Sequence, residues 1–113
     1  MMKKTIIILY ALAFFAVSDC VAATATIYVG AQQQAGYAVY MDGSQSIGRN
    51  PNGLDDIFGI REYSWDFGDG SEEEFGEFLN TASHVYNSPG SYTIKLTVVD
   101  YTGETAETTA VIL

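Results

Sequence analysis

The chain has few of the residues that stabilise or direct several common classes of protein. One cysteine, one histidine and five lysines and arginines stand against fourteen aspartates and glutamates in 113 residues. One cysteine excludes an internal disulfide, and one histidine excludes a metal site built from several histidines. The formal net charge of −9 opposes binding to nucleic acid and to anionic lipid, which attract lysine and arginine. Cationic partners and divalent metals are compatible with this charge.

Long hydrophobic runs are absent as well. The one apolar stretch, Thr5 to Val17, is shorter than the roughly 20 residues that a transmembrane helix needs. Lys3 and Lys4 precede this stretch, and small residues follow it. This order of charged, apolar and small residues is typical of a secretory signal peptide. The sequence therefore predicts an exported protein that is secreted, periplasmic or located at the cell surface.

The predicted processing site sets the extent of the mature domain. We expect cleavage after Ala23, with residues 1–23 as the signal peptide and residues 24–113 as one small domain. A second interpretation makes Cys20 the lipidated first residue of a lipoprotein, although Asp19 before it is a poor match to the small residue needed there. Removing residues 1–23 takes away two lysines, one aspartate and the cysteine, so the mature charge is −10. Hydrophobic packing alone must then hold the fold.

Short alternating segments dominate the mature sequence, and no segment has the pattern of a long helix. The expected strands cover residues 24–30, 37–44, 60–67, 92–99 and 105–113, with a turn or an edge strand within 71–78. The alternation places Tyr37, Val39 and Met41 on one face of a strand, and Tyr63, Trp65 and Phe67 on the buried face of another. Because no crossover helix is present, the pattern predicts an all-β antiparallel sandwich of about seven strands.

Two segments resemble the signature of the polycystic kidney disease (PKD) domain family. They are YSWDFGDGS at residues 63–71 and HVYNSPGSYTIKLTVVDYTGE at residues 84–104, and YMDGSQS at residues 40–46 is similar to a third motif of the family. The matching signature residues are Tyr63, Trp65, Asp66, Phe67, Gly68, Asp69, Gly70, His84, Tyr86, Gly90 and Tyr92. The resemblance covers essentially the whole mature chain and implies an immunoglobulin-like β-sandwich.

The resemblance also implies a class of function. Domains of this family occur in cell-surface and secreted proteins, where they commonly accompany proteases, collagenases and polysaccharide-degrading enzymes. They act there as spacers or as modules that bind proteins and carbohydrates. We therefore expect a non-catalytic exported module with a protein or polysaccharide ligand. The alternative is a structural spacer or assembly unit without a specific ligand, stabilised by calcium.

Two loops are longer than the family pattern requires, and they contain the candidate binding residues. These loops run from Ser46 to Ile60 and from Ser71 to Ser83, and we call them the first and the second long loop. Phe58 in the first loop and Phe75 and Phe78 in the second have no evident role in the core. Aromatic side chains are common anchors of interfaces, so we expect these three to contact a partner.

Calcium is the cofactor that the first long loop suggests. Asn50, Asn52, Asp55 and Asp56 supply oxygen ligands at close spacing, and Asp42 lies in a turn that we expect nearby. The resemblance adds that some family members bind calcium near the loop that precedes the tryptophan strand. The alternative is a polar loop in water, and the EF-hand pattern is absent.

The remaining polar signature residues are expected to build the fold. Asp66 and Asp69 flank a glycine turn, where carboxylates accept backbone N–H groups, and nothing in the sequence arranges them as an acid and base pair. His84 is expected to be a hydrogen-bonded structural residue beside Tyr86. The last strand has no charge after Glu107, so its edge predicts weak self-association.

Overall fold

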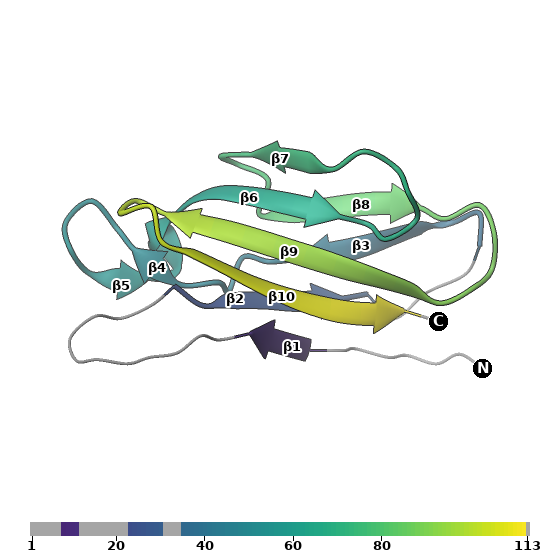
Figure 1. Cartoon of the computed structure of the whole chain (residues 1–113), viewed down its shortest axis with the longest axis horizontal. Helices are drawn as coiled ribbons and strands as arrows, with labels where there is room; N and C mark the ends of the chain where they lie inside the picture. The colour runs from purple at the N-terminus through teal and green to yellow at the C-terminus, as the bar shows by residue number, and fades with distance from the viewer. Residues whose placement is uncertain (1–7, 12–22, 31–34, 113) are drawn as a thin grey trace.

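Two antiparallel sheets face each other in this computed structural model, which describes residues 8–11, 23–30 and 35–112 (Figure 1). The elements in chain order are β1 (Ile8–Ala11), β2 (Ala25–Val29), β3 (Ala38–Asp42), β4 (Gly48–Arg49), β5 (Asp55–Asp56), the 3-10 helix η1 (Ile57–Gly59), β6 (Ile60–Asp66), β7 (Glu74–Gly76), β8 (Thr81–Val85), β9 (Tyr92–Asp100) and β10 (Thr105–Ile112). One sheet has the order β1-β2-β3-β8, the other β10-β9-β6-β7, and β4 pairs with β5. Every one of these pairings is antiparallel, which confirms the predicted β-sandwich.

The core lies between the two sheets and is centred on β6 and β9. Alternation along these strands turns Trp65, Leu96 and Ile94 inward, and all three are fully buried. The indole Nε1 of Trp65 donates a hydrogen bond to the carbonyl oxygen of Leu79 at 2.7 Å, so its one polar atom is satisfied inside the core. Side chains of this size each contribute about 1.5–3 kcal/mol when they leave water, which supplies the stability that a disulfide would otherwise add.

Tyr37 does not share the buried face of its neighbours. Val39 and Met41 are buried, but Tyr37 precedes β3 and is 61% exposed. The expected face therefore applies only to Val39 and Met41, because the strand begins at Ala38 and the chain before it belongs to a turn. The first long loop is also more ordered than a plain loop, since it contains β4, β5 and η1.

Part of the predicted signal peptide forms the outermost strand of its sheet. Ile8–Ala11 pairs with residues 25–28 of β2, and β1 also contacts β10, the edge strand of the opposite sheet. Ala23, after which we expect cleavage, is buried, and Thr24 exchanges backbone hydrogen bonds with Ile47. None of the helices in the described residues is long and apolar enough to cross a membrane. Cleavage, lipidation at Cys20 (outside the described residues) and self-association stay predictions.

Candidate functional site

The signature turn after β6 is held by its own carboxylates. Asp66 Oδ1 accepts a hydrogen bond from the backbone N–H of Gly68 at 3.0 Å, and Asp69 Oδ1 accepts from the N–H and the hydroxyl of Ser71 at 3.1 and 2.6 Å. Gly68 has a φ of 80°, and a Cβ there would overlap the carbonyl oxygen of Thr93. Glycine is therefore required at this position by both the backbone angle and the space available.

Asp69 also joins the two ends of the second long loop. His84 in β8 places Nε2 2.7 Å from Asp69 Oδ2, and its ring stacks on Phe67 with centroids 4.2 Å apart. The hydrogen bond from the Ser71 hydroxyl, with a further contribution from His84, lowers the pKa of Asp69 to about 2. The Ser71 hydroxyl donates its hydrogen bond to Asp69 and not to the His84 imidazole. A serine nucleophile donates to the imidazole that acts as its base, so these three residues do not have the arrangement of a catalytic triad.

The other signature residues hold the ends of β8 and β9. Tyr86 donates its hydroxyl to the carbonyl oxygen of Phe67 at 2.7 Å, and its ring stacks on Tyr92 with centroids 4.3 Å apart. Burial raises the pKa of the Tyr86 hydroxyl, which therefore stays protonated. In the chain, Tyr63, Trp65 and Asp66 lie in β6, Phe67, Gly68, Asp69 and Gly70 in the turn after it, His84 in β8, Tyr86 directly after β8, Gly90 before β9 and Tyr92 at its start.

One buried carboxylate is among the contacts that attach the first long loop to the sandwich. Asp100, at the end of β9, accepts from the backbone N–H of Arg49 through Oδ2. Its other oxygen accepts from the N–H and hydroxyl of Thr102 and from the N–H of Glu104. Burial alone would raise the pKa of Asp100, but these hydrogen bonds outweigh it and the pKa lies below its ordinary value. Four donors to one buried charge make this contact structural.

The predicted calcium ligands of this loop bind to each other and to the backbone. Asp55 forms a bidentate ion pair with Arg49 at 2.9 and 3.3 Å. Asp56 accepts from the side-chain amide of Asn50 and from the N–H of Phe58, both at 3.0 Å. Asn52 uses its backbone N–H on Asn50, and Asp42 lies in β3. In the part of the chain that the structure describes, no group of three His, Cys, Asp or Glu side chains is placed to hold a metal ion.

Comparison with known proteins places this sandwich and its signature in a family. The family model described as PKD domain matches residues 21–112. The chain belongs to the PKD domain family. This PKD domain is also 46% identical over 44 residues to Collagenase ColA of Clostridium perfringens (strain 13 / Type A), an overlap of 39% of the chain and 4% of the collagenase. The chain thus spans a small fraction of the length of this relative. PKD domains are non-catalytic modules typical of extracellular proteins.

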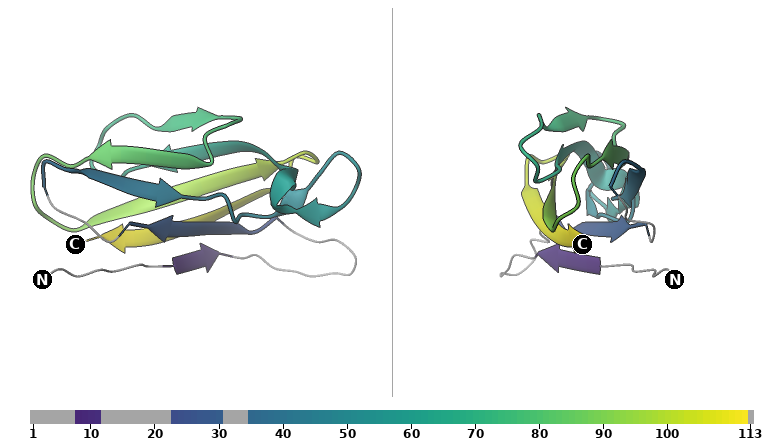
Figure 2. Two further views of the ribbon diagram at one scale, coloured as in Figure 1. Left: turned by 180° about the vertical axis from the view of Figure 1, so that it is seen from behind. Right: turned by 90° about the vertical axis from the view of Figure 1, so that its right-hand side faces the viewer.

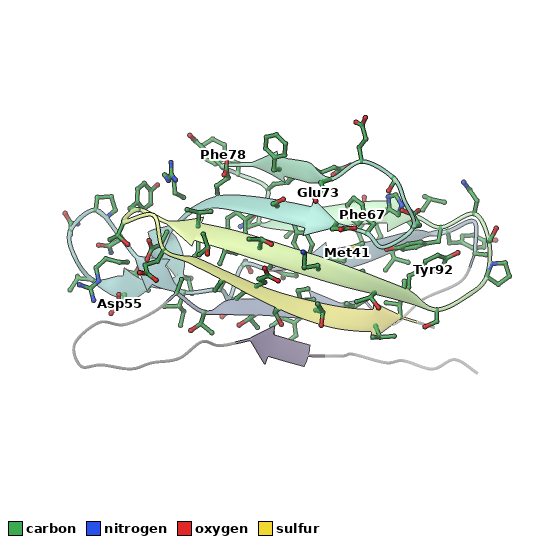
Figure 3. The ribbon with its side chains drawn as sticks, in the orientation of Figure 1. Met41, Asp55, Phe67, Glu73, Phe78 and Tyr92 are labelled. Atoms are coloured by element: carbon green, nitrogen blue, oxygen red, sulfur yellow. The ribbon has the colours of Figure 1, made fainter. Side chains whose placement is uncertain are left out.

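The three predicted aromatic anchors of this PKD domain are exposed, but they belong to two different segments. Phe75 in β7 and Phe78 after it are 69% and 88% exposed, whereas Phe58 in η1 is 75% exposed. Figure 3 shows Phe78 beside β7 and Asp55 at the β4–β5 end of the molecule. The second long loop therefore presents two of the three anchors together in sequence.

Sequence reasoning missed a groove on the outer face of β2, β3 and β8 of this PKD domain. Tyr28 and Tyr40 line it, and its volume is about 840 Å³. A signal was present, since Tyr28 lies between the inward-facing Ile27 and Val29, and Tyr40 between Val39 and Met41. The period that buries these neighbours turns both tyrosines outward.

Proposed function

We propose that this PKD domain is an exported, non-catalytic binding module that docks a protein partner through the second long loop. The observation that carries the proposal is the pair of exposed rings at Phe75 and Phe78. Large aromatic side chains at this exposure contribute nothing to the core, and at interfaces they dominate the binding free energy. The loop lies between two signature segments that hold it at both ends, so the rings are presented from a rigid base.

The charge of the same loop indicates the kind of partner. Glu72, Glu73, Glu74 and Glu77 surround the two phenylalanines, and Ser71–Ser83 contains no lysine or arginine. The partner surface that complements it has apolar pockets for the rings and a basic rim for the carboxylates. Such a surface is attracted by the net charge of −9, which raises the association rate and makes it fall with added salt.

The test begins with a photo-crosslinking amino acid at position 78 of the full chain, in the native host, and identification of the attached protein by mass spectrometry. Affinity is then measured between the purified partner and a Phe75→Ala, Phe78→Ala double variant. We expect a loss of tenfold or more, or about 1.4 kcal/mol, with the free energy of unfolding unchanged within about 0.5 kcal/mol.

Phe58→Ala is the matched control, because Phe58 is equally exposed but lies in the first long loop. This variant should bind the partner as the wild type does. The proposal fails if the double variant binds normally, or if Phe58→Ala weakens binding as much as the double variant does.

A structural spacer is the second candidate function, and the places where β2 starts and β10 finishes favour it. The molecule measures 45 × 23 × 20 Å, and β2 starts on the side of β4 and β5 while β10 finishes towards the opposite end of the long axis (Figure 1). With residues 1–23 removed as predicted, these two points are the ends of the folded domain and lie apart along this axis. A spacer predicts that position 78 crosslinks to no more protein than position 37, on a different loop, does.

A further inference from the structure

The outer face of the β2-β3-β8 sheet carries a groove that Phe75 and Phe78 of the docking loop do not line. Figure 2, left, faces this sheet, and none of the described helices and strands lies over it. The groove has a volume of about 840 Å³, which is within the range of sites that bind small ligands. Its floor is formed by the three strands, and Glu74 and Leu79 of the second long loop line it as well.

Two tyrosines stand together on the floor of the groove. Tyr28 is paired with Asp42 across β2 and β3, and Tyr40 lies two residues before Asp42, so both rings project from the same face as diagonal neighbours. Tyr28 is 37% and Tyr40 67% exposed. Diagonal neighbours in a sheet are about 7–8 Å apart, close enough for one ligand to cover both rings.

The polar side chains of the groove are rich in acceptors. Asp42 uses Oδ1 to accept from the N–H of Ser44 at 2.8 Å, and its Oδ2 accepts no hydrogen bond from a described residue. The side chains of Glu74, Thr81 and Ser83 likewise make no hydrogen bond to other described residues. Two carboxylates and two hydroxyls therefore line the groove together with the tyrosines and have capacity for a ligand.

The backbone of the middle strand of the groove floor is used within the sheet. β3 pairs with β2 on one side and with β8 on the other, whereas β8 is the edge strand and pairs with β3 alone among the described strands. Over β2 and β3 recognition is therefore left to aromatic planes and to side-chain oxygens. The described lining residues include no lysine, arginine or histidine, which disfavours phosphorylated, sulfated or uronic-acid ligands.

We infer that this groove binds a neutral oligosaccharide. A sugar ring offers an apolar C–H face that packs on tyrosine, and its hydroxyls donate to the acceptors that the groove supplies. Tyr28 and Tyr40 carry the stacking contacts, while Asp42 binds hydroxyl pairs. Glu74 and Phe75 are adjacent in β7 and project to opposite faces of the strand. The sugar groove and the phenylalanine docking surface are therefore separate, and either assignment can fail without the other.

The test measures retardation of the full chain in native gels that contain barley β-glucan, xyloglucan, galactomannan or the anionic polymer polygalacturonate. We expect retardation by at least one neutral polysaccharide and none by polygalacturonate. Tyr40→Ala should weaken binding about tenfold, whereas Tyr40→Phe keeps the ring and should retain most of it. Asp42→Asn should also weaken binding, since Asn can still accept from Ser44 but loses the carboxylate.

Tyr37→Ala is the control, because Tyr37 is as exposed as Tyr40 but does not line the groove. It should bind like the wild type, and so should Phe75→Ala. The inference is overturned if none of the neutral polysaccharides retards the chain, if polygalacturonate binds more tightly than they do, or if Tyr40→Ala and Tyr37→Ala have equal effects.

Discussion

The two long loops of this PKD domain have similar lengths but opposite relations to the sandwich. The first, Ser46 to Ile60, pairs the side chains of Asp55 and Asp56 within the loop and is attached to the sandwich by contacts that include the buried carboxylate of Asp100. The second, Ser71 to Ser83, is joined at its ends by Asp69 and His84 and leaves its aromatic and acidic side chains in water. The first loop is therefore a structural part of the sandwich, whereas the exposed side chains of the second loop are available to bind a partner.

The largest expected effect comes from breaking the attachment of the first loop. Asp100→Asn replaces a carboxylate that accepts four hydrogen bonds with an amide whose NH2 group must face a donor. We expect a loss of about 3 kcal/mol in the free energy of unfolding, measured by urea denaturation. Glu104→Gln, in the same turn but exposed, should lose little. A small effect of Asp100→Asn would show that the loop is held mainly by its own contacts.

A pair of glycine substitutions compares the packing of the two loops directly. A Cβ at Gly59 would overlap the carbonyl oxygen of Gly48, whereas a Cβ at Gly76 in β7 meets nothing within 4 Å. Gly59→Ala should therefore destabilise the protein by about 2 kcal/mol, and Gly76→Ala should leave stability unchanged or slightly raised. Equal thermal midpoints for the two variants would mean that the β4–β5 segment shifts freely and is packed no more tightly than β7.

The closure of the second loop should be visible in the pH dependence of stability. Asp69 has an ordinary pKa of 3.8 and a folded-state pKa of about 2, so it is ionised in the folded protein over a range where the unfolded chain binds a proton. Its stabilising contribution is complete above about pH 4 and is lost as the pH falls towards 2. In the Asp69→Asn variant the urea midpoint should change less with pH over this range. The pH dependence that remains should come from Asp100, whose lowered pKa acts in the same direction. Identical slopes for the variant and the wild type would exclude this role.

Calcium is expected to have the smallest effect on the melting temperature. A measurable effect would show whether the first loop binds a ligand as well as supporting the fold. A ligand that binds only the folded form raises the melting temperature by mass action. In the first loop calcium must displace Arg49 from Asp55, so we expect at most a small rise between chelator and millimolar calcium. A rise that disappears in Asp55→Asn would establish the predicted site, and a flat response would leave the loop stabilised by its own hydrogen bonds.

Most of the fold was predictable because it depends on local alternation. The period-two pattern in β6 and β9 determines which side chains are buried, and the glycines after Phe67 have the positive φ angles expected of a tight turn. Tyr37 was misplaced because a strand boundary depends on pairing, and β3 begins one residue later. The partner of Asp100 is Arg49, 51 residues away, and no local pattern reports such a contact.

The candidate sites were predictable only in part. The exposure of Phe75 and Phe78 follows from their place among glutamates, so composition is sufficient. The sugar groove depends on which strands are neighbours, because Tyr28 and Tyr40 are brought together by the β2–β3 register. The alternation in the sequence predicts that each tyrosine points outward, but only the pairing of β2 with β3 brings the two tyrosines into one site.

Strand β1 determines which strand lies at the edge of its sheet. In the whole chain Ile8–Ala11 is the outer partner of β2, and the backbone of β2 is covered on that side. The predicted cleavage after Ala23 would remove this partner and leave that row of backbone groups facing water, where a neighbouring chain could pair with it. On this prediction the segment that directs export would also delay assembly until it is removed.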